Sequence, residues 1–264
     1  MKRMEFGGPD FDIFSAVKYS RAGREYTICF LSSRKTKRSI NLKDKKIQVE
    51  DIKKLPMVQS FIETGNQNLG AMGYTEHSYR HAGLVSNIAS NILERLDYSQ
   101  RDCELVAIAG YLHDIGNVIT RYNHGQSGAY LAMKILQDLE MSWDEVALII
   151  GAIGNHEEEY GQPVNKIAAA LILADKSDVH SSRVRNPDVA NFDIHDRVNF
   201  AVKHSFLRVD SSKRIITLEL TIDTEVSGVM EYFEIFLTRM VMCRRAAAAL
   251  DSSFSLVINE TKLL

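Results

Sequence analysis

The stretch Tyr111-Leu112-His113-Asp114-Ile115-Gly116-Asn117 places a histidine and an aspartate side by side at the end of an apolar segment. The residues before it repeat apolar side chains at helical spacing, and the glycine is typical of a helix end. Imidazole and carboxylate groups are both good ligands for divalent metals. Five of the eight histidines lie between residues 77 and 156. This grouping predicts a metal site, and therefore chemistry.

The composition is that of an ordinary globular protein. Of the 264 residues, 45% are hydrophobic and 25% are charged, and the formal net charge is -2. Such a small charge argues against broad electrostatic capture of nucleic acid. The three cysteines are scattered without metal-ligand spacing, no apolar run reaches transmembrane length, and the first residues form no apolar targeting segment. We therefore expect a cytoplasmic protein that binds neither membrane nor nucleic acid.

Helical periodicity covers most of the chain from Thr75 onward. Thr75 is the expected N-cap of the first helix, Ser99 caps the second, and Ser142 opens a capping box. The predicted helices cover about residues 75–96, 99–114, 126–139, 142–154, 166–179 and 194–203. Strand periodicity takes over after His204, at residues 206–209, 215–222 and 254–258, with a long helix at 227–250 between the last two.

The pattern predicts a mainly α fold with three parts. Residues 1–65 form an N-terminal extension with a strand at 26–31, residues 66–205 a helical metal-binding domain, and residues 206–264 a small α+β subdomain. The glycine- and asparagine-rich residues 65–70 are expected to be a connector. In the last part, the first two strands should form a hairpin, the third should join the same sheet, and one helix face should cover it. That face consists of Phe233, Phe236, Leu237, Met240 and Val241.

Four more side chains extend the His113–Asp114 pair. His124 and His156 lie at predicted helix ends, and His77 lies in the first turn of its helix. Asp175 lies in an otherwise apolar helix, where a buried carboxylate needs a cation or strong hydrogen-bond donors. Helix ends of this kind can meet at one end of a bundle.

These segments resemble, in order and spacing, the H…HD…H…H…D signature of the HD-domain metal-dependent phosphohydrolases. The segments are His77-Ser78, Leu112 to Gly116, Asn155-His156-Glu157 and Ala174-Asp175. The resemblance covers roughly residues 70 to 200 and implies an HD-domain helical bundle. It implies that the core metal set is His77, His113, Asp114 and Asp175. His124 and His156 match the two extra histidines of the binuclear members, in which the aspartate of the HD pair bridges the metals.

The resemblance to the cyclic-dinucleotide phosphodiesterase branch is incomplete. Asn155 stands where that branch has the first histidine of its HHE stretch, and its GYP triplet is absent, which speaks against cyclic di-GMP. Asn117 stands where a lysine often follows HDIG. The expected substrate is therefore a small phosphorylated molecule, either a nucleotide or another phosphoester.

The chemistry implied is metal-assisted hydrolysis. Two divalent transition metals, about 3.5–4 Å apart, would share Asp114 and a water, and the resulting hydroxide would attack phosphorus in line. His113 and Asp114 are the expected catalytic pair. Iron or manganese is expected, with zinc, cobalt and nickel as alternatives.

Further residues are candidates for contact with the substrate. His81 competes with His77 as the first ligand, and His77 is preferred because His77-Ser78 fits the HS pair of the family. His81 and Asn117 are then expected in the substrate pocket. Arg183 and Arg185 follow the Asp175 helix closely, and a guanidinium suits bidentate binding of phosphate.

Three alternatives stay open at this point. The site could hold one metal, with His124 and His156 contacting substrate. The chain could be a non-catalytic HD-type regulatory or nucleotide-binding module, whose α+β tail senses a ligand or forms a homodimer. It could also be a di-iron oxygenase on the same fold, because the ligand types are the same.

Overall fold

The chain divides into two compact units between residues 45 and 46. The computed structural model describes residues 11–21, 24–33 and 46–263. In the first unit, β1 (Phe11–Arg21) and β2 (Arg24–Ser33) form an antiparallel hairpin, so that β1 joins the strand expected at 26–31. The division falls before α1 (Val49–Lys53) and α2 (Pro56–Ala71), which both belong to the second unit and not to an extension ending at residue 65.

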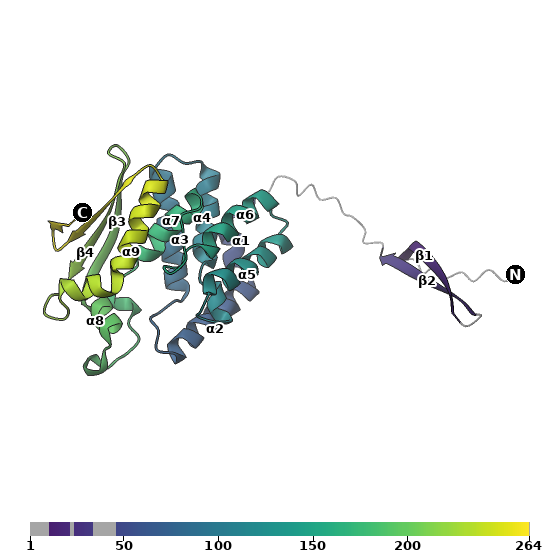
Figure 1. The fold of residues 1–264 in the computed structure, drawn as a ribbon, viewed down its shortest axis with the longest axis horizontal. Helices are drawn as coiled ribbons and strands as arrows, with labels where there is room; N and C mark the ends of the chain where they lie inside the picture. Colours follow the sequence, from purple (N-terminus) through teal and green to yellow (C-terminus); the bar gives the residue numbers. More distant parts are fainter. Residues whose placement is uncertain (1–10, 22–23, 34–45, 264) are drawn as a thin grey trace. The chain divides into compact units, whose positions relative to one another are not determined.

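Helices form most of the second unit (Figure 1). After α2 they are α3 (Tyr79–Arg95), α4 (Gln100–Leu112), α5 (His124–Asp138), α6 (Trp143–Gly154), α7 (Lys166–Ser177) and α8 (Ile194–Ala201). Short 3-10 turns lie at η1 (Ile115–Val118), η2 (Ser181–Arg183) and η3 (Val189–Asn191). The predicted helical body is confirmed, while residues 65–70, expected as a connector, lie inside α2.

The start of α3 differs from the prediction. Ser78 is the N-cap, and its hydroxyl oxygen accepts the backbone N–H of Arg80. Thr75 lies in the preceding loop, where the N–H of Glu76 donates to the carbonyl of Arg183. His77 therefore precedes the helix and is not in its first turn.

Helix α7 is the centre of the helical body. All eleven residues from Ile167 to Ser177 are buried, and the helix contacts α3, α4, α6 and α9. A helix that is apolar on every side is typical of such a position. Its C-terminal end carries Asp175 into the interior.

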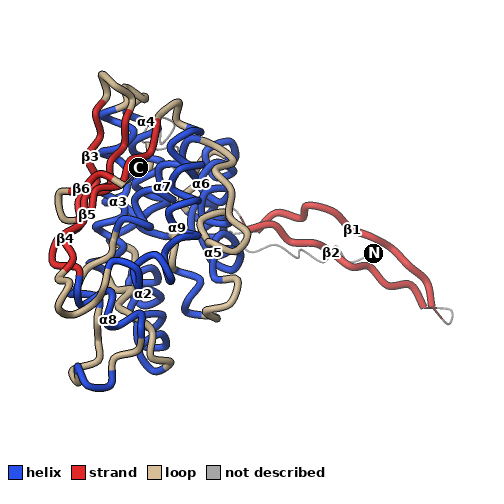
Figure 2. The backbone as a smooth tube through the Cα atoms, turned by 60° about the vertical axis from the view of Figure 1, so that its left-hand side comes forward, coloured by secondary structure: helices blue, strands red, loops and turns tan. Residues whose placement is uncertain are grey.

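The strands β3 (Val202–Asp210), β4 (Ile215–Ile222), β5 (Ser253–Ile258) and β6 (Thr261–Lys262) form one sheet in that order. Figure 2 shows these strands together at one side of the helices. The β3–β4 hairpin is antiparallel, and β5 pairs with β4 in parallel. The predicted hairpin, and the joining of the third strand to it, are confirmed.

The predicted face of the long helix α9 (Val229–Ala249) is partly wrong. Phe236 and Met240 are buried as expected, but Leu237 is 57% exposed, and Tyr232 and Cys243 are buried instead. The reason is that α9 packs against α7 as well as against β5, so its buried face is turned toward the helical body. Residues 206–263 thus share the core of the second unit. No helix in the described part of the chain is long and apolar enough to span a membrane.

Candidate metal centre

The His113–Asp114 pair lies where α4 meets η1. His113 is fully buried, and Asp114 is the residue before the 3-10 turn. The side-chain amide of Asn117 donates to both the carbonyl and the carboxylate Oδ1 of Asp114, at 3.0 Å each. Asn117 was expected to contact substrate, but it is buried and orients the aspartate from one turn further along.

Five histidine rings, including that of His113, surround Asp114 and are held in nearly the same way. Four of them direct Nδ1 at a backbone carbonyl oxygen, at distances from 2.6 to 3.0 Å; these are His77, His113, His124 and His156. The fifth, His81, directs Nδ1 at the carboxylate of Asp178, at 2.7 Å. Because these oxygens only accept, each Nδ1 carries the proton, and the Nε2 of a neutral ring has a free lone pair. This is the usual arrangement of histidines that ligate metals.

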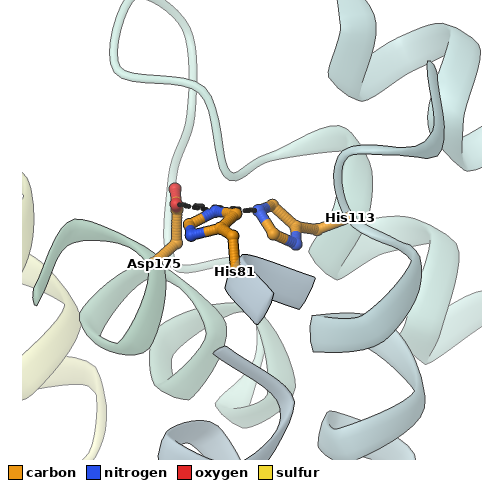
Figure 3. Close-up of side chains that lie close together, drawn as sticks. All are labelled: His81, His113 and Asp175. Atoms are coloured by element: carbon orange, nitrogen blue, oxygen red, sulfur yellow. Dashed lines mark hydrogen bonds and ion pairs between the residues drawn. The ribbon is translucent and has the colours of Figure 1, made fainter. Parts of the chain in front are cut away.

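One group of ligand atoms consists of His81, His113 and Asp175, whose side chains point toward one another in Figure 3. The Nε2 atoms of the two histidines are 3.2 Å apart. Asp175 Oδ1 lies 3.4 Å from His81 Nε2 and 3.6 Å from His113 Nε2. The other oxygen of Asp175 lies 2.7 Å from Lys176 Nζ, which fixes the orientation of the carboxylate.

A second group lies on the other side of Asp114. His113, Asp114 and His156 offer atoms close enough to hold a metal. His124 Nε2 lies 3.0 Å from His156 Nε2 and 3.2 Å from Asp114 Oδ1. The structure therefore brings five of the six predicted metal ligands into these two groups, with Asp114 between them, and His77 lies beside them, with its Nε2 4.0 Å from Asp114.

The sequence favoured His77 over His81 as the first metal ligand, and the positions of the two rings reverse this preference. His81 Nε2 is 3.4 Å from an oxygen of each of the two aspartates, whereas His77 Nε2 is 4.0 Å from Asp114. His81 is also the more deeply buried ring. The geometry thus favours His81 as a ligand beside His113 and Asp175, and it leaves His77 at the cavity wall facing Asp114.

Two carboxylates outside the predicted set support the histidines. Asp178 accepts from His81, and Glu157 lies 3.1 Å from His124 Nδ1 while it accepts the backbone N–H of Gly125 at 2.7 Å. Each group of ligands thus has one histidine backed by a carboxylate, which increases the basicity of the ligating nitrogen. In the sequence, Glu157 follows His156 in the segment that resembles the family and opens a run of three glutamates, but nothing there indicates its contact with His124.

The electrostatics of the centre favour a bound cation. Burial would raise the pKa of Asp114, but the neighbouring His113 and His77 hold it well below its usual range. Burial opposes charge on His113 as well, yet its interactions with Asp114 and Asp175 raise its pKa to about 10. Burial and the charges of His124 and His113 lower the pKa of His156 to about 3. The carboxylates are therefore ionised, and a metal would displace the proton that they hold on His113.

The two arginines expected to contact phosphate have other partners. Arg183 is buried, and it donates to the backbone carbonyls of Glu76 and Asp178 at 2.9 Å each. Arg185 donates to Asn66. Asn66 lies in α2 and accepts the backbone N–H of His77, and Arg185 also donates to the carbonyl of Thr75 in the loop before α3. Both arginines thus tie this loop to the chain after α7, which explains why His77 is held beside the centre.

A cavity of about 550 Å³ opens onto the centre. Its walls include His77, Asp114, His124, His156 and Asp175. Three tyrosines that lie at least one-third exposed also face it, namely Tyr74, Tyr122 and Tyr160. Helices α8 and α9 supply further wall residues, including Asn199, Phe236 and Arg239. A volume of this size suits a small organic ligand.

Comparison with known proteins agrees with the resemblance in the sequence. Residues 74–180 match the model of the HD domain family. The chain is 25% identical over 215 residues to an uncharacterised protein of Methanocaldococcus jannaschii, covering 72% of this chain and 81% of that protein. The crystal structure of a predicted HD superfamily hydrolase from an uncultured Thermotogales bacterium is 24% identical. This match covers 50% of this chain and 74% of the Thermotogales chain, with a TM-score of 0.37.

Proposed function

We propose that this protein is a metal-dependent phosphohydrolase that cleaves a small phosphorylated molecule, a nucleotide or another phosphoester. The observation that carries the proposal is the convergence of five imidazole Nε2 atoms on two ionised carboxylates beside a cavity. Histidine and carboxylate together are the ligands of hydrolytic transition-metal sites.

The residues present fit a metal. Asp114 Oδ2 is buried and makes no hydrogen bond of good geometry within the described part of the chain. The two Nε2–Nε2 contacts, at 3.0 and 3.2 Å, would bring lone pairs together if all the rings were neutral. A cation placed between such atoms removes both problems at once.

We further propose two metal ions with Asp114 shared between them. His81, His113 and Asp175 would hold one ion, and His124 with His156 the other. In this assignment His81 replaces His77 in the first group, because its Nε2 is nearer to both carboxylates. Iron or manganese is the proposed metal, and zinc, cobalt and nickel fit the same donors.

When bound, the metals would supply a hydrolytic nucleophile near neutral pH and withdraw charge from the phosphoryl group. The protein's own residues prepare the site for this chemistry. Asn117 and Lys176 fix the orientations of the two aspartates, and Asp178 and Glu157 fix those of two imidazoles. A cytoplasmic location and a homodimer remain predictions.

The test is hydrolysis by protein loaded with Mn²⁺ under anaerobic conditions. We expect release of phosphate from at least one member of a panel of nucleotides and generic phosphoesters, at a rate far above that of the His113→Ala variant. Activity with manganese and without oxygen would also exclude the di-iron oxygenase. A panel with no turnover above that variant, together with stoichiometric metal, would contradict the proposal and favour a regulatory module.

The support of His124 by Glu157 gives a test of the second ion. Glu157→Gln removes the charge behind His124, and we expect it to weaken binding of one of the two metals by about 10- to 100-fold. Titration calorimetry with Mn²⁺ measures this, and Glu94→Gln is the control because Glu94 is exposed on α3 and does not line the cavity. Two unchanged binding steps in Glu157→Gln would argue for a single ion.

A further inference from the structure

Arg121 lies in the loop between η1 and α5, on the wall of the cavity. One of its terminal nitrogens, Nη1, is 3.5 Å from His124 Nε2. Its guanidinium carbon lies 5.3 Å from the ring centroid of Tyr74, which also lines the cavity. Stacking on an aromatic face holds a guanidinium in a defined plane and leaves its N–H groups free to donate at its edge.

The other cationic side chains of the cavity are already engaged. Lys176 pairs with Asp175 at 2.7 Å, Arg239 pairs with Glu158 at 2.8 Å, and Arg183 donates to backbone carbonyls. The described part of the cavity wall includes four arginine or lysine side chains, Arg121, Lys176, Arg183 and Arg239. Of these four, Arg121 has neither an ion pair within 4.0 Å nor a hydrogen bond to a carbonyl or carboxylate oxygen. It is partly buried, so its charge faces the cavity without full hydration.

We infer that Arg121 binds the phosphoryl group that is hydrolysed, and that this group is a terminal one. The inference rests on the proposed function. An anion bound to the metal ion that His124 would hold comes within reach of the guanidinium, because only 3.5 Å separates Arg121 Nη1 from His124 Nε2. The positive charge of the guanidinium then offsets the negative charge on the phosphoryl oxygens in the transition state.

The number of non-bridging oxygens on the phosphorus distinguishes a monoester or terminal phosphate from a diester as the substrate. The guanidinium fork donates two parallel N–H groups to two oxygens of one phosphate. A phosphodiester has only two non-bridging oxygens, and a metal takes at least one of them. A terminal phosphoryl group has three, which suffice for a metal and for both arms of the fork. The substrate is therefore a phosphomonoester or the terminal phosphate of a nucleotide, in preference to a diester.

The experiment compares Arg121→Ala and Arg121→Lys with the wild type. Arg208→Ala is the matched control, because Arg208 lies 5.4 Å from the Phe206 ring centroid and pairs with Glu219 on the exposed side of β3, outside the cavity. The first measurement is binding of inorganic phosphate to Mn²⁺-loaded protein by calorimetry. The second is kcat/KM for matched monoester and diester substrates, with thermal unfolding and metal content as checks on integrity.

We expect Arg121→Ala to weaken phosphate binding by about 10- to 100-fold, in line with the loss of charge-assisted hydrogen bonds, with metal content unchanged. Arg121→Lys should recover only part of this, because an ammonium lacks the fork. Arg121→Lys should also lower the preference of the enzyme for the monoester over the diester. Arg208→Ala should match the wild type in every measurement.

Three results would overturn the inference. Phosphate binding by Arg121→Ala equal to that of the wild type, or no phosphate binding by the wild type, removes the role of Arg121 even if the protein is a phosphohydrolase. A wild type that cleaves diesters in preference to monoesters overturns the assignment of a terminal group. If the wild type hydrolyses nothing while Arg121→Ala loses phosphate binding, the proposed function fails and the anion-binding role of Arg121 is supported.

Discussion

Asp114→Asn is expected to reduce turnover by at least about 10³-fold. Enzymes typically accelerate their reactions by about 10⁶-fold or more, so this would remove a large part of the rate enhancement. Asp114 lies between the two groups of ligands, with Oδ1 facing His124 at 3.2 Å and Oδ2 facing His113 at 3.2 Å. Asparagine has nearly the same shape but offers one oxygen and no charge. It therefore cannot serve both groups, and we expect the metal content to fall from two ions to one or fewer.

Elemental analysis and phosphate release measure the two parts of this prediction. Asp144→Asn is the control, because Asp144 is exposed in the first turn of α6. His156 follows the other end of that helix, and at about 1.5 Å of rise per residue the two ends are about 18 Å apart. An Asp114→Asn protein that keeps two metals and its rate would show that Asp114 does not connect the ions.

Gly116→Ala is expected to destabilise the fold by about 3 kcal/mol or more, at the upper end of the cost of overpacking. A Cβ at this position would overlap the carbonyl oxygen of His124 and would lie 2.6 Å from the backbone nitrogen of Gly128. Both contacts are with the backbone of α5, which cannot rotate away as a side chain can. The helix must move, and His124 moves with it.

Urea denaturation measures this loss, and Gly83→Ala is the matched control. Gly83 lies within α3 and has no atom within 4 Å of an added Cβ. Alanine there should stabilise the protein by about 0.5–1 kcal/mol, because glycine is a poor helix residue. Equal stability changes in the two variants would mean that the close approach of η1 and α5 is not rigid.

The order of helices α3 to α7 followed from the sequence because their signals are local, and so did the candidate ligands at their ends. The choice between His77 and His81 did not follow, because it depends on distances to two aspartates. Apolar residues at helical spacing predict α3 to α7, and the histidines and aspartates fall at their ends. The role of Glu157 did not follow, since its contact with His124 spans 33 positions along the chain. Arg121 gave no signal either, because it lies in a loop and is identified only by what it faces.

Residues 65–70 show why local signals also mislead. Glycine and asparagine there favour a connector, yet the segment is helical. A Cβ at Gly65 would lie 3.1 Å from the backbone nitrogen of Val118, so this glycine allows α2 to pack closely on η1. Tertiary packing thus outweighs helix propensity at that position. Thr75 and Ser78 are both good caps by type, and the contacts of the loop with Arg183 decide between them.

The packing of α9 on α7 limits how this protein can be divided. The part that matches the HD family ends at residue 180, but the buried surface of α7 is completed by α9, which begins only at Val229. A fragment cut after the match would expose an apolar helix that is buried on every side in the whole chain, and exposed apolar surface of that kind promotes aggregation. The candidate metal centre and the C-terminal segment therefore rest on one shared core, and the segment cannot be exchanged for another without rebuilding that interior.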